Sequence, residues 1–484
     1  MQRRRVTAAA LAAVLLVAGC SGGDGDDAAP AAGDERASEE TTSSGPQSPT
    51  AGAPGVGDPY YPGAGNGGYD VEHYALDLTW DRDALRLSGT ATLTATATQD
   101  LSSLSLDLAD VDVSAVTVDG VDAPWDGPAG GEMTVTPAQP LAQGAEFTLA
   151  VTYGVTPLTA DGSDAFAPGW FGNDGEMFVL FEPNGAPTLF PVNDHPTDKA
   201  TYDFRITAPE DLEVAANGLL MVTELGPGVR TWVYESAHPM ASYLVQVVIA
   251  DLEVQESTGP GGLPIRHAID TDTIGSVRPA VDRIGDMIEF YSGRFGPYPF
   301  EAYGMLVLDA PLGLALETQT LSTFGTLSAE DEQVVAHELA HQWFGDDVSV
   351  ATWQDIWLNE GFATYAQWMW SEDAGDRTAD ERAEEVNLNP QAYPLPPGDP
   401  GAGSMFDISV YDRGALTLHV LRRTIGDDDF FELLQTWVDR NGGGSASTAD
   451  FEALAEDVSG EELTPLFDAW LRAPAMPDVQ DWIP

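Results

Sequence analysis

The chain has 484 residues, a length that allows about two to four domains. Its 20 basic and 78 acidic side chains give a formal net charge of −58, which argues against a nucleic acid partner because phosphates would be repelled. The charge is compatible with attraction of cationic ligands toward an acidic cleft, and equally with a solvated acidic surface that serves solubility.

The first residues have the pattern of an export signal. Three arginines at positions 3–5 precede a short apolar run over 7–18, too short to span a bilayer comfortably. The run Val17-Ala18-Gly19-Cys20 resembles the lipobox of bacterial lipoproteins, in which the signal is cut before the cysteine and the cysteine is acylated. We expect a signal peptide at 1–19 and a lipid anchor at Cys20, the only cysteine, outside the cytoplasm on the cell membrane. The alternative is an ordinary signal peptide with an incidental cysteine.

Residues 20–57 are predicted to form a disordered tether. From residue 21 to about 56 they are rich in Gly, Ser, Ala, Pro, Thr, Asp and Glu, and they contain no aromatic residue. If Cys20 is acylated, no cysteine is left for a disulfide, so the domains that follow must be held together by their hydrophobic cores.

Residues 58–256 have a β pattern. Threonines at 90, 92, 94, 96 and 98 alternate with Ala91, Leu93, Ala95 and Ala97, a period of two. Further strands are expected at 202–208 and 243–254. Many short strands with Gly, Asp and Pro turns predict an antiparallel β-sandwich or a saddle-shaped sheet.

Residues 257–484 are predicted to be mainly helical, which makes the whole chain an α+β multidomain protein. The spacing of apolar residues predicts a helix over 277–295, a strand over 303–308 and a second helix over 329–344, capped by Ser328 and closed by Gly345. Another helix is expected from Asp355 through Met369, and three helical pieces between Tyr411 and Leu471.

The motif His337-Glu338-Leu339-Ala340-His341 predicts a metal site. Two histidines spaced i, i+4 lie on one face of a helix, one turn apart, so both can bind one ion. An antiparallel pair of helices would bring Glu360 across as a third ligand, and three protein ligands with an open fourth position are typical of catalytic zinc. Glu338 can take a proton from a metal-bound water. We therefore predict one zinc ion held by His337, His341 and Glu360, with Glu338 as the catalytic base.

The run from His337 to Gly345, His-Glu-Leu-Ala-His-Gln-Trp-Phe-Gly, and the run Trp-Leu-Asn-Glu-Gly-Phe-Ala at 357–363 together resemble the aminopeptidase N family of zinc metallopeptidases. Three other segments also resemble that family: 67–74, 190–200 and 295–300. The resemblance covers the chain from about residue 58 to its end. It implies an N-terminal β domain over 58–256, a thermolysin-like catalytic domain over 257–484, and removal of N-terminal residues from peptides.

Three further residues correspond to functional positions of that family. Tyr411, within Tyr-Asp-Arg-Gly-Ala, matches its catalytic tyrosine, which would donate a hydrogen bond to the oxyanion. Glu317 occupies the glutamate of the exopeptidase motif, ordinarily Gly-Ala-Met-Glu-Asn, which here is Leu314-Ala315-Leu316-Glu317-Thr318. Glu182 matches, by its spacing from Asp194, a second side chain that binds the substrate amine. The alternatives are a packing tyrosine and two surface glutamates.

The resemblance implies a zinc aminopeptidase with peptide substrates, whose only membrane contact is the lipid anchor. The sequence ends soon after Leu471, without room for the long helical domain that covers the active site in many relatives, so we expect a more open cleft. Two alternatives stay open: an endopeptidase with the same zinc chemistry, and a catalytically weak lipoprotein that binds peptides. The oligomeric state and the preferred N-terminal residue are not predicted.

Overall fold

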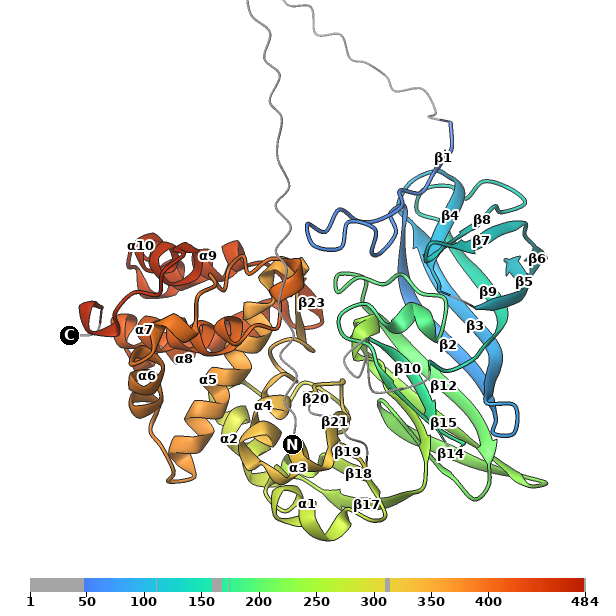
Figure 1. Ribbon diagram of the computed structural model, residues 1–484. Helices are drawn as coiled ribbons and strands as arrows, with labels where there is room; N and C mark the ends of the chain where they lie inside the picture. The colour runs from blue at the N-terminus through green and yellow to red at the C-terminus, as the bar shows by residue number, and fades with distance from the viewer. Residues whose placement is uncertain (1–47, 110, 159–167, 174, 310–313, 483–484) are drawn as a thin grey trace, which may run out of the picture. The chain divides into compact units, whose positions relative to one another are not determined.

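The computed structural model describes residues 48–109, 111–158, 168–173, 175–309 and 314–482. The predicted signal peptide, the acylation site Cys20 and most of the predicted tether lie outside these residues. The described residues from Ser48 onward belong to one body of contacts. Within it the β-rich half is coloured blue to green and the helical half yellow-green to red (Figure 1).

An eight-stranded sheet dominates the first half, in the order β14-β15-β12-β2-β3-β9-β5-β6. The predicted alternation is present in β3, where Ala91, Leu93 and Ala95 are buried and the threonines between them are partly exposed. The sheet is antiparallel except where β2 and β12 run parallel. Its strands are β2 (Tyr69–Asp81), β3 (Arg86–Ala97), β5 (Asp112–Val118), β6 (Val121–Asp122), β9 (Glu146–Val155), β12 (Ala200–Pro209), β14 (Leu219–Gly226) and β15 (Val229–Met240).

Two four-stranded sheets accompany it, ordered β1-β4-β8-β7 and β10-β11-β16-β13. Their strands are β1 (Thr50–Ala51), β4 (Leu101–Asp107), β7 (Trp125–Ala129), β8 (Glu132–Val135), β10 (Gly169–Asn173), β11 (Glu176–Leu180), β13 (Glu213–Ala216) and β16 (Val247–Ala250). The pairing of β1 with β4 corrects the predicted tether. Thr50 N donates to Asp100 O at 3.0 Å, so the last residues of the 20–57 segment are part of the fold.

A five-stranded sheet, ordered β17-β18-β19-β21-β20, leads into the helical half. Its strands are β17 (Leu252–Thr258), β18 (Pro264–Asp270), β19 (Met305–Leu308), β20 (Ala315–Leu316) and β21 (Ser322–Gly325). The predicted domain boundary after residue 256 falls inside β17. Because β17 pairs with β18 along its whole length, the sheet places residues 252–258 with the second half.

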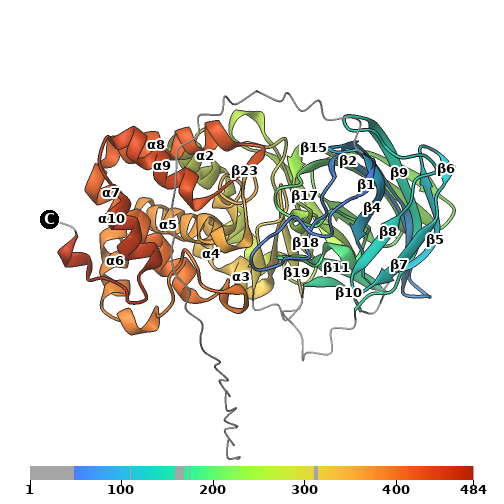
Figure 2. The same ribbon diagram turned by 90° about the horizontal axis from the view of Figure 1, so that it is seen from above.

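The helices occupy the rest of the chain, and Figure 2 shows α4 and α5 side by side among them. The predicted helix over 277–295 is two helices, separated at Asp282 and Arg283. The helices are α1 (Ile274–Val281), α2 (Ile284–Phe295), α3 (Thr326–Glu330), α4 (Glu332–Ala340), α5 (Trp357–Asp373), α6 (Ala379–Asn387), α7 (Gly414–Ile425), α8 (Asp427–Asn441), α9 (Thr448–Ser459) and α10 (Thr464–Phe467). The last four helices, α7 to α10, lie between Tyr411 and Leu471, where the sequence predicted three helical pieces. In the part of the chain that the structure describes, no helix is both long and apolar enough to cross a bilayer.

Residues 58–61, which we call the N-terminal strap, connect the two halves. Asp58 Oδ2 accepts a hydrogen bond from the backbone of Trp353 at 2.7 Å and lies 3.3 Å from His195 Nε2. The hydroxyl of Tyr60 donates to Asp399 at 2.6 Å. Apolar packing continues across the same junction, because one cluster of buried side chains includes strands of the first half and helices of the second.

Candidate active site

The helix that carries His337, and has His341 as its C-cap, begins later than predicted. α4 starts at Glu332, with Asp331 as its N-cap, whose side chain accepts a hydrogen bond from Gln333 N at 3.0 Å. The predicted cap, Ser328, lies in α3 and donates to the carbonyl of Leu314 at 2.9 Å. Both residue types cap helices well, and the extended backbone of Asp331 decides between them. The helix also ends earlier, at Ala340, so Gly345 lies beyond it.

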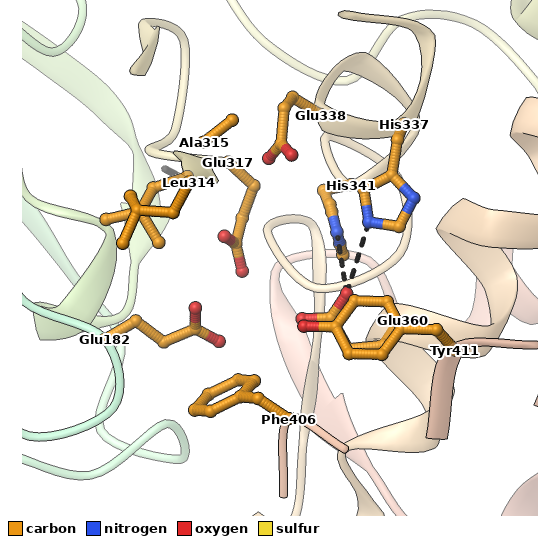
Figure 3. Close-up of a pocket in the computed structure, with 11 residues that line it drawn as sticks. Glu182, Leu314, Ala315, Glu317, His337, Glu338, His341, Glu360, Phe406 and Tyr411 are labelled. Atoms are coloured by element: carbon orange, nitrogen blue, oxygen red, sulfur yellow. Dashed lines mark hydrogen bonds and ion pairs between the residues drawn. The ribbon is translucent and has the colours of Figure 1, made fainter. Parts of the chain in front are cut away.

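α5 supplies the third candidate ligand from its first turn. The connection from α4 is longer than a tight hairpin and includes β22 (Val348–Val350), yet the two helices pack together. Glu360 Oε2 lies 3.2 Å from His337 Nε2 and 3.4 Å from His341 Nε2. Figure 3 shows the two imidazoles directed at the Glu360 carboxylate.

These three side chains fit a zinc ion. Their ligand atoms lie within 4.8 Å of one another. Nitrogen and oxygen ligands bound tetrahedrally at about 2.0–2.1 Å are separated by about 3.3 Å, close to the two measured distances. His341 Nδ1 lies 3.0 Å from the carbonyl of Phe344, so its proton is held there and Nε2 is left free to bind a metal. The donor set therefore suits zinc with a fourth position open.

Burial and neighbouring charge control the ionisation of the carboxylates. Glu338 is 6% exposed, and burial raises its pKa well above the ordinary value, with the charges of Glu317 and Glu360 adding to the shift. Burial opposes ionisation of Glu360 as well, but the charge of His341 and hydrogen bonds from both histidines lower its pKa to about 2. The ligand is thus held as a carboxylate, while Glu338 is made readier to accept a proton.

His337, His341 and Glu360, which we call the metal triad, line a cavity of about 470 Å³. Glu182 follows β11 and Glu317 follows β20, and both carboxyl groups are directed into this cavity (Figure 3). In each glutamate Oε1 is buried and has no hydrogen-bond partner among the described residues. Burial, followed by the charge of Glu317, raises the pKa of Glu182 well above its usual value. Two such groups would be stabilised by a cation between them.

Tyr411 lies on the other side of the triad, in a π-helical turn (Ser409–Arg413) that precedes α7. Its ring stacks on His337 with centroids 6.0 Å apart. Burial raises the pKa of Tyr411 well above its usual value, so the phenol keeps its proton and can donate it in a hydrogen bond. Arg413, fully buried, donates to the carbonyls of Trp470 at 2.8 Å and Leu395 at 3.2 Å and holds the turn in place.

Two glycines let this turn approach the ligand-bearing helix. A methyl group added at Gly414 would lie 3.0 Å from the Cα of Gly361, which directly follows Glu360. Because the atoms that such a methyl group would meet are backbone atoms, glycine at both positions lets the starts of α7 and α5 pack this closely without strain. The contact brings Tyr411 and Glu360 into the same cavity.

The structure thus brings all the predicted site residues inside the described chain together in one cavity, including Glu182. The sequence did not indicate Phe406, which is 41% exposed and also lines the cavity. The only signal for it was a single aromatic residue within the Pro- and Gly-rich stretch 394–410. Leu314, Ala315 and Leu316, which precede Glu317 in the segment compared with the exopeptidase motif, also line the cavity. Figure 3 shows Leu314 and Ala315 on the side of Glu317.

Comparison with known proteins agrees with this geometry. The model of the peptidase family M1 domain matches residues 280–470, and the model of the peptidase M1 N-terminal domain matches residues 70–244. Among curated relatives, Aminopeptidase M1-C of Oryza sativa is 28% identical over 61% of this chain, and Aminopeptidase 2 of Candida albicans is 25% identical over 84%. The matches cover 37% and 47% of those two proteins, so the chain spans less than half their length.

Solved structures match over nearly their whole length. An M1 zinc metallopeptidase from Deinococcus radiodurans, in a variant bound to a Tyr-Ser-Ala substrate, superposes with a TM-score of 0.82 and 33% identity, covering 88% of this chain and 99% of the other. A second M1 zinc metallopeptidase structure from that organism superposes with a TM-score of 0.80 and 34% sequence identity. These similarities imply one catalytic zinc ion. The chain therefore belongs to peptidase family M1, the aminopeptidase N family of zinc metallopeptidases.

Proposed function

We propose that this protein is a zinc aminopeptidase that removes the N-terminal residue from peptides. One observation carries the proposal. The cavity that contains the metal triad also contains two buried carboxylate oxygens, on Glu182 and Glu317, without hydrogen-bond partners in the described chain. The free α-ammonium of a peptide is the cation that would satisfy them while the first peptide bond lies over the triad.

The residues of the cavity can then divide the chemistry of hydrolysis. A zinc ion held by His337, His341 and Glu360 would polarise the scissile carbonyl and make the attacking water more acidic. Glu338 is placed to accept the proton of that water and to return it to the leaving amine. Tyr411 is placed to donate a hydrogen bond to the oxygen that becomes negatively charged.

The test is to compare a free peptide with its N-acetylated twin. Tyr-Ser-Ala, the substrate in the neighbour's structure, is a suitable probe. We expect the zinc-loaded protein to release tyrosine from the free peptide and to cleave the acetylated one at least about a hundredfold more slowly, because acetylation removes the charge and leaves both carboxylates unpaired.

Other outcomes would support the alternatives. Equal cleavage of the two peptides would favour an endopeptidase. Binding of the free peptide without cleavage, at full zinc content, would favour the catalytically weak peptide-binding protein.

A further inference from the structure

Gln342 makes an unusually complete set of hydrogen bonds beside the active site. The side chain is fully buried. Its Nε2 donates to the carbonyl of Glu317 at 2.9 Å and to Asp346 Oδ2 at 2.7 Å. Its Oε1 accepts from Thr320 N at 2.9 Å and lies 3.0 Å from the Tyr298 hydroxyl. Both donors of the carboxamide are therefore in use, and its oxygen accepts from Thr320 N and shares the single Tyr298 hydroxyl proton with the carbonyl of Ala302, 3.0 Å from that hydroxyl.

These bonds hold both ends of one short segment, residues 317–320. The segment needs such support because Thr320 has a φ of 65°, which is rare for a β-branched residue and costs energy. The Thr320 hydroxyl also accepts a hydrogen bond from Gly218 N at 2.7 Å, from the first half of the chain. Contacts from outside the segment thus keep it in a conformation that it would not favour alone.

The second acceptor of the Gln342 amide, Asp346, is itself held in place by another residue. Asp346, which accepts one of its hydrogen bonds, belongs to a loop that is bound by Lys199, the only lysine in the chain. Lys199 Nζ donates to the carbonyl oxygens of Asp346 at 2.7 Å and Asp347 at 2.9 Å. Burial lowers the pKa of Lys199 to about 8, against the opposing charges of Asp347 and Asp346, so the ammonium remains mostly charged at neutral pH.

We propose that Gln342 is a positioning residue for recognition of the substrate amine, acting through the backbone of Glu317. The inference rests on the proposed aminopeptidase function and adds a residue to it. Gln342 directly follows the metal-binding His341, so its two bonds to the 317–320 segment set the position of the Glu317 carboxylate relative to the metal. The Glu317 Oε1 atom has no hydrogen-bond partner in the described chain, so the backbone of Glu317 is what fixes its position.

The experiment compares Q342M with Y298F. Q342M keeps the length of the side chain and removes every hydrogen bond that this side chain makes. Y298F removes a hydroxyl that lies 3.0 Å from both Gln342 Oε1 and the carbonyl of Ala302, and it leaves the bond from Gln342 to the Glu317 carbonyl in place. The quantity measured is the ratio of kcat/KM for free Tyr-Ser-Ala to kcat/KM for its N-acetylated twin. We expect Q342M to lower this ratio about tenfold or more, mainly by raising KM for the free peptide, at unchanged zinc content. Y298F should keep the ratio within about twofold of the original protein.

A second variant, Q342E, covers the case in which Q342M fails to fold. Q342E keeps the acceptor for Thr320 N but replaces the donor to the Glu317 carbonyl with an oxygen, so it should also lower the ratio. An unchanged ratio in the folded Gln342 variants would overturn the inference, as would an equal fall in Y298F or failure of both Gln342 variants to fold, since each points to a general structural role. A ratio near one in the unmodified protein would instead overturn the aminopeptidase function on which the inference rests.

Discussion

Glu338 shares its surroundings with Glu317 and His341 in a cavity of about 470 Å³, where one carboxylate oxygen or ring nitrogen of each lies within 4.8 Å of the others. In such a place a carboxylate is costly unless a cation is close, and burial raises the pKa of Glu338 accordingly. A base with a raised pKa holds a proton more firmly than an exposed glutamate does. This property suits the proposed role of Glu338, in which it takes a proton from water and then releases it to an amine.

Glu338→Gln tests this role at the scale of a single residue. The substitution keeps the size of the side chain and removes its ability to accept a proton, while His337, His341 and Glu360 remain to bind zinc. We expect kcat to fall by about 10²–10⁴-fold, the range for general base catalysis, with unchanged zinc content by atomic absorption. Turnover close to that of the original protein in zinc-loaded E338Q would show that another group is the base.

The same crowding has a consequence for stability. Because E338Q removes a buried carboxyl group whose ionised form is unfavourable next to Glu317, the variant should unfold at a temperature no lower than the original protein. A large fall in melting temperature would mean that the lost activity reflects damage to the fold, and the kinetic result would then say nothing about the proton.

At the scale of elements, the site depends on how closely α5 and α7 approach. Glu360 and Tyr411 stand on either side of the contact between Gly361 and Gly414. Neither histidine is involved in this contact, so the position of Tyr411 over the triad is set by helix packing and by the buried Arg413. A change in this packing should alter catalysis without changing any reacting group.

Gly414→Ala is the corresponding prediction. The added methyl group would meet the Gly361 backbone at 3.0 Å, and the backbone cannot move aside cheaply. We expect a loss of about 1–3 kcal/mol in the free energy of unfolding, measured by denaturant titration, together with a fall in kcat.

Gly293→Ala is the matched control, because a methyl group at this position of α2 would meet nothing within 4 Å. It should be neutral or stabilise the protein by up to about 1 kcal/mol, since alanine favours a helix more than glycine does. Equal effects of the two substitutions would show that the helix contact is not tight.

For the whole molecule, a net charge of −58 and a shared apolar core act in opposite directions. Self-repulsion of so many acidic groups weakens the folded state near neutral pH and is relieved on acidification. A buried histidine acts against that trend. His267 lies in β18, where its Nδ1 accepts a hydrogen bond from Met305 N at 3.1 Å, and burial lowers its pKa to about 4.

His267 should therefore make the fold less stable in acid. Above a pH of about 6.5, His267 is neutral in both the folded and the unfolded state. Between pH of about 6.5 and 4 the unfolded chain binds a proton at this histidine and the folded chain does not, so the free energy of unfolding falls by up to about 3 kcal/mol. His267→Asn keeps an acceptor for Met305 N and removes the titration. We expect the stability difference between the original protein and H267N to shrink by about that amount from pH 7 to pH 4, measured by urea unfolding. A difference that does not depend on pH would contradict the prediction.

Local patterns predicted well which residues gather in the cavity, and they predicted the limits of the elements poorly. The alternation in β3 and the helical spacing of the two histidines depend on neighbours in sequence, and both are present as predicted. The start of α4 was misplaced because Ser328 and Asp331 are both good caps, and the contact of Ser328 with Leu314 is a tertiary one. The predicted end of the tether was misplaced for the same reason, since only the pairing with β4 orders Thr50 and Ala51.

The sequence by itself determined the family and the spacing of His337, Glu338 and His341, because a helix fixes the relation between residues one turn apart. The lipid anchor at Cys20 remains a prediction from sequence. Only the tertiary structure decided that Glu182 and Glu317, which follow strands of two different sheets, face each other in one cavity, and that Gln342 holds the second of them. Such contacts join residues far apart in the chain, where no local period relates one side chain to another and only the packing of the whole fold sets the distance.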